Sequence, residues 1–336
     1  MGRSALRPDD GAYKIMRGFE SRLPGGTSCR FALLWPRGRT ASCSGARSSL
    51  PREETLPVYE RLGDVRSVAV TQGKIADILF QRGELDEALR IRKEEEMPVY
   101  ERLGDVREMA VTQGKIADIL FGRGELDEAL RIRKEEEMPV YERLGDVREM
   151  AITQGKIADI LFQRGELDGA LRIRKEEEMP VYERLGDVRS VAITQGKIAD
   201  ILFRRGELDE ALRIHREERL PTCEKLGDLD GKAHVLFSCA QLRLARAKGE
   251  PKRDEIEAIL NELGESFAIL RKLERPDGVA AVGSLLGQVL AAGGATEPAL
   301  KVLEEAAIAY ELRSPTRRWG KQTPRARCAS CKSASG

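Results

Sequence analysis

Residues Tyr100–Val140 read YERLGDVREMAVTQGKIADILFGRGELDEALRIRKEEEMPV, and this 41-residue block decides the fold. Near-identical copies flank it, so that four blocks run head to tail at Tyr59–Val99, Tyr100–Val140, Tyr141–Val181 and Tyr182–Thr222. A fixed period of this length indicates a supersecondary unit that cannot bury its apolar face alone and buries it against its neighbours. The repetition predicts a solenoid, which presents a binding surface rather than a catalytic pocket.

The first half of each block has the pattern of an amphipathic helix. In the first block, Gly63 and Asp64 are suited to end one helix and to cap the next. We expect helix A over residues 65–82, ended by Gly83, because its apolar residues recur at three- and four-residue steps and share one face. Those residues are Val68, Ile75, Ala76, Leu79 and Phe80.

The second half of the block predicts a second helix, helix B, from about Glu84 towards Arg102. Acidic residues in its first turn complement the positive end of the helix dipole. Three charged pairs spaced four residues apart are expected on its exposed side, each worth tenths of a kcal/mol. They are Asp86–Arg90, Arg90–Glu94 and Arg92–Glu96.

Two residues break the helical pattern at the same place in every block. Pro98 falls inside helix B and is expected to kink or split it, because proline lacks an N–H and clashes with the preceding turn. Gly73 lies in the middle of helix A at a cost of about 1 kcal/mol relative to Ala. We interpret its recurrence as a close approach at that point, with packing favoured over contact with a bound peptide.

These residues resemble the tetratricopeptide repeat (TPR), in its longer-period variety of about 40–42 residues. The TPR pattern Trp-x-x-Leu-Gly-x-x-Tyr, then Ala-x-x-x-Phe, aligns with Gln72-x-x-Ile75-Ala76-x-x-Leu79 and with Ala88-x-x-x-Arg92. The small residues Ala76 and Ala88 are those that let the two helices approach closely. The chain departs from the pattern at Gln72, where the family favours Trp, at Arg92, where it favours an aromatic residue, and at Glu95, where it usually has Ala.

The resemblance implies an all-α, right-handed α-solenoid of stacked antiparallel helix pairs, flanked by disordered basic tails. We expect a TPR-like array over residues 53–228 and two divergent helical pairs over residues 229–312. The last pair carries Leu286-Gly287, Gly294 and Ala299-x-x-x-Leu303 at TPR spacing. Residues 53–62 match the end of helix B and look like half of an earlier block.

The two tails are the expected disordered segments, at residues 1–52 and 313–336. The first carries ten Lys or Arg against three acidic residues and the second seven against none, which leaves a net charge of −13 on residues 53–312 of a chain whose total is +1. Tails of this composition favour solvated disorder over nucleic-acid or membrane binding. Cys328-Ala-Ser-Cys331 has the spacing of a zinc or redox pair but stands alone, and we expect no metal or cofactor.

Function is expected on the concave face, which TPR arrays line mainly with helix A and wrap around an extended or helical segment of another protein. By position, each layer of this face offers one lysine, one aspartate and one phenylalanine to an extended peptide. The candidate residues are Lys74, Asp77, Phe80, Lys115, Asp118, Phe121, Lys156, Asp159, Phe162, Lys197, Asp200 and Phe203. The alternative is that the charges form a solvated face and the phenylalanines belong to the core between repeats.

Other function classes leave weaker signals. With two histidines and no phosphate-binding glycine loop, we expect no enzymatic activity and no small-molecule substrate. The chain is expected to be a cytoplasmic scaffold that binds other proteins, with self-association as a further possibility. The alternative is a sensor or autoinhibitory arm of a larger signalling protein.

Overall fold

The computed structural model describes residues 55–247 and 252–313, and within these ranges every element is helical. The described residues form two compact units, an N-terminal unit of residues 55–207 and a C-terminal unit of residues 208–313. The all-α prediction is confirmed for the described part of the chain. The tails and the Cys328–Cys331 pair lie outside it.

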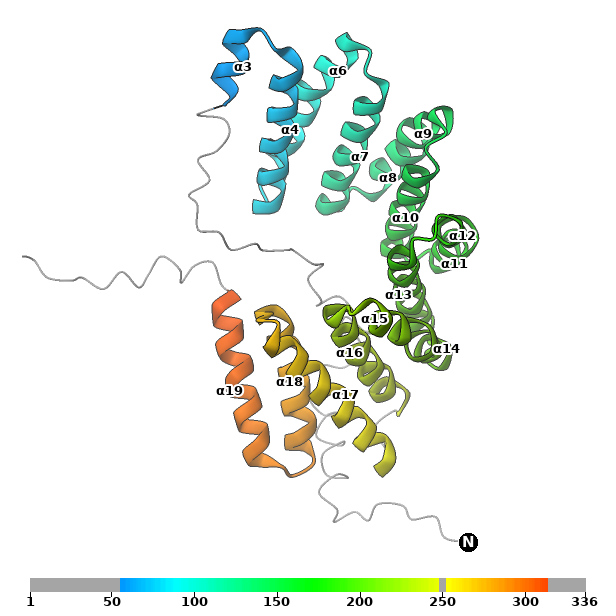
Figure 1. The fold of residues 1–336 in the computed structure, drawn as a ribbon, viewed down its shortest axis with the longest axis vertical. Helices are drawn as coiled ribbons and strands as arrows, with labels where there is room; N and C mark the ends of the chain where they lie inside the picture. Colours follow the sequence, from blue (N-terminus) through cyan, green and yellow to red (C-terminus); the bar gives the residue numbers. More distant parts are fainter. Residues whose placement is uncertain (1–54, 248–251, 314–336) are drawn as a thin grey trace, which may run out of the picture. The chain divides into compact units, whose positions relative to one another are not determined.

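Helix A is the longest element of each block in the N-terminal unit. It comprises α4 (Val65–Arg82), α7 (Val106–Arg123), α10 (Val147–Arg164) and α13 (Val188–Arg205), and Figure 1 shows these helices following one another through the unit. The aspartate before each helix accepts a hydrogen bond from the backbone N–H three residues on, as Asp64 does from Ser67 at 3.0 Å. The glycine after each helix adopts φ near +83°, a left-handed conformation that ends the helix without strain. The expected bounds of helix A are confirmed.

Helix B is divided into an α-helical, a π-helical and a second α-helical segment. In the first block these are α5 (Leu85–Arg90), η2 (Ile91–Glu96) and α6 (Met97–Leu103). The Met97 N–H donates to the Arg92 carbonyl five residues back, which is the π-helical pattern. Pro98, which has no N–H, lies at the start of the segment that follows. The prediction that proline splits helix B is confirmed.

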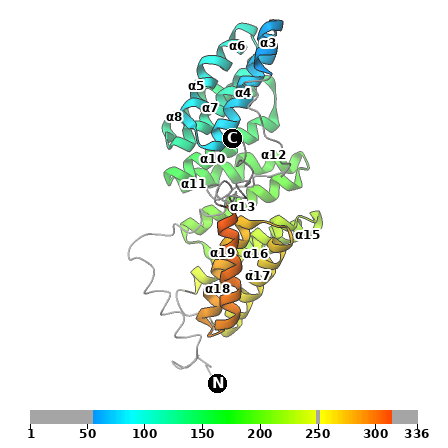
Figure 2. The same ribbon diagram turned by 90° about the vertical axis from the view of Figure 1, so that its left-hand side faces the viewer.

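The same division recurs in the later blocks, and a short helix precedes the first one. The N-terminal unit also contains α3 (Leu56–Leu62), α8 (Leu126–Arg131), η3 (Ile132–Glu137), α9 (Met138–Leu144), α11 (Leu167–Arg172), η4 (Ile173–Glu178) and α12 (Met179–Arg184). Figure 2 shows the shorter helices beside the long ones in the turned view.

Each core cluster of the N-terminal unit combines side chains from two adjacent blocks. Ala76 and Ala88 are completely buried and pack with Ile75 and Ile91 of their own block, and Ile119 of the next block completes the cluster. Equivalent clusters follow at the next two junctions. No block closes its core alone, which is the property expected of a stacked repeat.

The C-terminal unit begins with the second helix of the fourth block and continues with less regular pairs. Its elements are α14 (Leu208–Arg213), η5 (Ile214–Arg219), α15 (Leu220–Leu226), α16 (Leu229–Arg246), α17 (Arg253–Lys272), α18 (Pro276–Ala292) and α19 (Thr296–Arg313). Glycines let α18 approach its neighbours closely, since a Cβ on Gly287 would lie 2.5 Å from Leu303 Cγ. Among the described residues, none of the helices has the length and apolarity that crossing a membrane requires.

Candidate functional site

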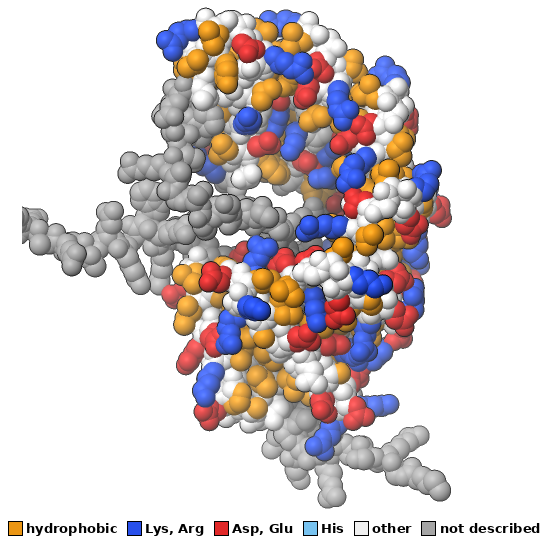
Figure 3. Space-filling model, viewed as in Figure 1, with side chains coloured by type: hydrophobic (Ala, Val, Ile, Leu, Met, Phe, Trp, Pro, Cys, Tyr) orange, Lys and Arg blue, Asp and Glu red, His pale blue; other side chains and the backbone are white. Residues whose placement is uncertain are grey.

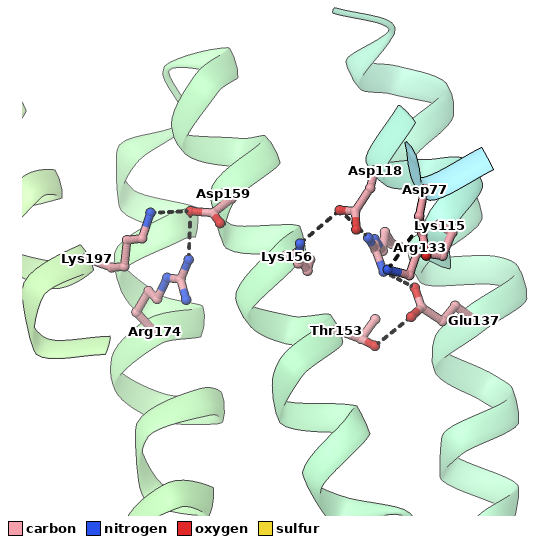
Figure 4. A network of polar contacts seen from close by, with 10 residues as sticks. All are labelled: Asp77, Lys115, Asp118, Arg133, Glu137, Thr153, Lys156, Asp159, Arg174 and Lys197. Carbon is pink, nitrogen blue, oxygen red and sulfur yellow. Dashed lines mark hydrogen bonds and ion pairs between the residues drawn. The ribbon is translucent and has the colours of Figure 1, made fainter. Parts of the chain in front are cut away.

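Three of the candidate lysines and three of the candidate aspartates form a ladder of ion pairs between blocks of the N-terminal unit. Lys115 of α7 lies 3.6 Å from Asp77 of α4. Figure 4 shows the equivalent pairs at the next two junctions, where Lys156 lies 2.9 Å from Asp118 and Lys197 lies 3.3 Å from Asp159. Each lysine therefore reaches back to the aspartate of the preceding block.

An arginine from helix B joins every rung of this ladder. Arg92 Nη2 lies 2.7 Å from Asp77 Oδ1, and Arg133 and Arg174 make the same contact with Asp118 and Asp159. The aspartates thus bind two cations each, one from their own block and one from the next. Side-chain exposure falls along the ladder from 44% for Asp77 to 15% for Asp159.

The pair Arg92–Glu96 was expected on the exposed side of helix B, and this prediction is wrong. Arg92 is 4% and Glu96 5% exposed, and Arg92 Nη1 donates to Glu96 Oε2 at 2.6 Å. The physical reason is that Arg92 follows Ala88 by four residues, so it lies on the buried face of helix B, where the TPR pattern has its aromatic residue. The alignment of Arg92 with the aromatic position of the TPR pattern therefore indicates that Arg92 is buried.

The recurring glycine of helix A makes room for this buried pair. A Cβ on Gly73 would lie 2.5 Å from Glu96 Oε1 and 2.9 Å from Arg92 Nη1, and Gly114 and Gly155 have the same surroundings. Packing, the interpretation favoured from the sequence, is confirmed for these three glycines. The other two departures also meet each other, because the Gln72 amide donates to Glu95 at 3.0 Å. Polar contacts therefore replace part of the aromatic packing typical of TPRs.

Burial also affects the protonation of the glutamates in these pairs. Burial raises the pKa of Glu96, Glu137 and Glu178 above the usual value, although the partner arginine acts in the opposite direction. Glu137 also accepts a hydrogen bond from Thr153 of the next block at 3.2 Å, which Figure 4 shows. The buried pair therefore links adjacent blocks as well as the two helices of one block.

The four candidate phenylalanines differ in their surroundings. Phe121 and Phe162 are half-buried and pack against the core clusters of their junctions, so part of each ring belongs to the core between repeats. The Arg204 guanidinium lies 3.9 Å from the centroid of the Phe162 ring. Phe80 is 37% exposed, which makes it the most accessible member of the group.

The fourth block departs from the others at the buried pair. His215 and Arg219 occupy the positions of Arg92 and Glu96, and both are buried, with His215 Nδ1 3.1 Å from an Arg219 nitrogen. Burial lowers the pKa of His215 well below its usual value, and the charge of Arg219 adds to this effect. Both effects favour the neutral form of His215. Among the described residues, no group of acidic, histidine or cysteine side chains is arranged to hold a metal.

Of the other two charged pairs expected on helix B, Arg90–Glu94 is present at 3.5 Å, and Arg90 also lies 2.8 Å from Glu87. Asp86, which was expected to pair with Arg90, contacts Arg123 of the next block at 3.1 Å. These contacts, about a third exposed or more, add little stability.

Comparison with known proteins rests on structure. No protein-family model and no curated protein sequence matches the chain. The structure is similar to the apo form of RapI, with a TM-score of 0.53 and 12% identity over 77% of this chain and 93% of that one. A crystal structure of nearly identical TPR-like repeats from Podosopora anserina gives a TM-score of 0.49 and 16% identity over 61% of this chain and 96% of that one.

A Rap protein in complex with Competence and Sporulation Factor gives a TM-score of 0.48 and 14% identity over 76% of this chain and 75% of that one. Identities this low bear on the fold alone. Together with the helix pairs, the left-handed glycine turns and the cores shared between blocks, the likeness to RapI shows that the chain has a TPR-like α-solenoid fold.

Proposed function

We propose that the chain is a non-enzymatic scaffold that binds peptide segments of partner proteins along the helix A face of its TPR-like repeats. One observation carries the proposal: the same lysine, aspartate and phenylalanine positions recur on α4, α7, α10 and α13 in chemically matched layers. An extended peptide that passes from block to block meets this chemistry at each step. The fold supports the proposal, because TPR arrays are protein-interaction modules.

The ion-pair ladder changes the role expected for the charges. Lys115, Lys156 and Lys197 already contact aspartates, so a ligand meets balanced pairs rather than isolated cations. Such pairs are suited to the polar groups of a peptide backbone, while apolar side chains of the ligand supply most of the affinity. Figure 3 shows basic and acidic side chains interspersed with apolar ones on the face in view.

A panel of substitutions tests this assignment. Peptides are first selected on the full chain from a phage-displayed library of random 12-residue sequences. Their affinity is then measured by fluorescence anisotropy for a variant with all four candidate lysines of helix A changed to Gln, at positions 74, 115, 156 and 197. We expect affinity to fall at least about tenfold, since each layer of a repeat array adds to the effective concentration at the next.

A matched variant controls for the loss of charge. It changes the four exposed arginines of helix B to Gln, at positions 90, 131, 172 and 213, and circular dichroism verifies the helicity of both variants. Equal effects of the two variants, or an affinity untouched by the lysine changes, would contradict binding along the helix A face.

A further inference from the structure

The position after each phenylalanine of helix A is one of the few that vary among the blocks. It is Gln81, Gly122, Gln163 and Arg204 in the four copies. Gly122 lies within α7 and does not have a positive φ, so the backbone does not require glycine there. Glycine also lowers helix stability relative to glutamine. Gly122 therefore lowers the stability of the helix, and the backbone conformation does not explain its presence.

Gly122 lies against the phenylalanine of the preceding block. A Cβ built on it would be 3.5 Å from Phe80 Cε2 and 3.7 Å from Leu85 Cδ1, both ordinary van der Waals distances. At the third junction of the array, Arg204 fills the equivalent position and covers Phe162, with its guanidinium 3.9 Å from the ring centroid. The missing side chain of Gly122 thus leaves Phe80 uncovered, consistent with its 37% exposure.

The charges around this opening are also the most accessible of the ladder. Lys115 and Asp77 are 45% and 44% exposed and lie 3.6 Å apart, the longest of the three lysine–aspartate distances. Lys74, on the same helix as Phe80, is exposed, and no carboxylate among the described residues contacts it. Apolar surface at Phe80 and an exposed lysine on the same helix together favour a ligand that carries both an apolar and an acidic group.

We propose that Phe80, Leu85 and Gly122 form the anchor subsite of the peptide-binding face. It takes one large aliphatic or aromatic side chain of the ligand, and an Asp or Glu next to that residue in the peptide is held by Lys74 or Lys115. This inference rests on the proposed function. It specifies which peptide residues the junction between the first and second blocks would recognise. At the other junctions a larger side chain occupies the position of Gly122.

The chain offers a matched pair of substitutions that tests this subsite. Gly122→Gln installs the residue of the first and third blocks. Its Cβ would lie at ordinary van der Waals distances from Phe80 and Leu85, and glutamine raises helix propensity, so loss of binding is not expected to come from unfolding. Gln163→Gly makes the reverse change at the next block. Both full-length variants are compared with the unchanged protein, using the library-selected 12-residue peptides as probes in fluorescence anisotropy.

We expect Gly122→Gln to weaken binding at least about tenfold, since burial of one large apolar side chain contributes at least that much. Gln163→Gly is expected to change affinity by less than about twofold, and the selected peptides to share a large apolar residue beside Asp or Glu. Unchanged binding by Gly122→Gln, or equal losses in both variants, overturns the subsite while the lysine panel still supports the face. Failure to select any peptide overturns both proposals.

Light scattering separates a peptide from a second copy of the chain as the occupant. We expect the same mass for the unchanged protein and Gly122→Gln. A dimer that Gly122→Gln converts to a monomer would assign the opening to self-association and overturn the peptide subsite.

Discussion

Replacement of Arg133 by Met is expected to destabilise the second block far more than a surface arginine does. Glu137 is 5% exposed. After the substitution its carboxylate loses the arginine and keeps the hydrogen bond from the Thr153 hydroxyl at 3.2 Å. A buried charge left in this way costs about 3–5 kcal/mol. Changing Glu137 to Leu in the same protein removes the stranded charge, and the double variant is expected to be about as stable as the unchanged chain, or more so.

Urea denaturation followed by circular dichroism measures these effects, with curves fitted to a nearest-neighbour model because each block contacts only its neighbours. Arg131→Met is the control, since Arg131 is 43% exposed and pairs with Glu128 at 2.8 Å, and an exposed ion pair of this kind adds little stability. A loss for Arg133→Met as small as that of Arg131→Met would refute the reasoning. So would a double variant as unstable as Arg133→Met alone.

Three further predictions concern Glu137, His215 and the contact between Arg204 and Phe162. Burial raises the pKa of Glu137, so its contribution to stability is present below about pH 4.5 and is lost as pH rises through the folded-state pKa. In urea denaturation, the Arg133→Met/Glu137→Leu variant should therefore become more stable relative to the unchanged chain as pH rises above about 4.5, and a stability difference independent of pH would count against this reasoning. His215 should stay neutral from pH 8 to 5.5 in nitrogen-detected NMR, whereas titration near 6.5 would mean that it is not desolvated. Arg204→Ala and Phe162→Leu should show a coupling of about 0.5–1 kcal/mol in a double-mutant cycle of unfolding, and additive effects would exclude the stacking contact.

Local rules were sufficient to predict the helices of each block. Asp64, Gly63 and Gly83 marked the ends of helix A because capping and left-handed turns depend on a few adjacent residues. The position of Pro98 predicted the split of helix B for the same reason. The six-residue π-helical segment before it was not predicted, since its hydrogen-bond register depends on how the whole helix packs.

The sequence predicts which residues lie on the candidate face, but it does not predict which of them contact one another. Spacing placed Lys115 and Asp77 on successive helices, yet their pairing across blocks depends on the offset between helices, which one block does not reveal. The charge of Arg92 predicts exposure, because arginine is rarely fully buried unless it is paired. Its alignment with an aromatic position, together with the small residue Gly73 opposite, was the better guide.

The ladder also has a consequence for how such an array changes in length. Every boundary between the first four blocks presents the same chemistry, with an aspartate and a buried arginine–glutamate pair on one side and a lysine on the other. If one 41-residue block is duplicated or deleted among these four, the new neighbours contact each other through the same residues as before. The array can therefore change in length without any other substitution. Near the end of the fourth block, His215 and Arg219 occupy the positions of the arginine and the glutamate. A block added after that position would meet a histidine and an arginine instead of the arginine–glutamate pair. The repeated chemistry of the boundaries therefore ends at the fourth block.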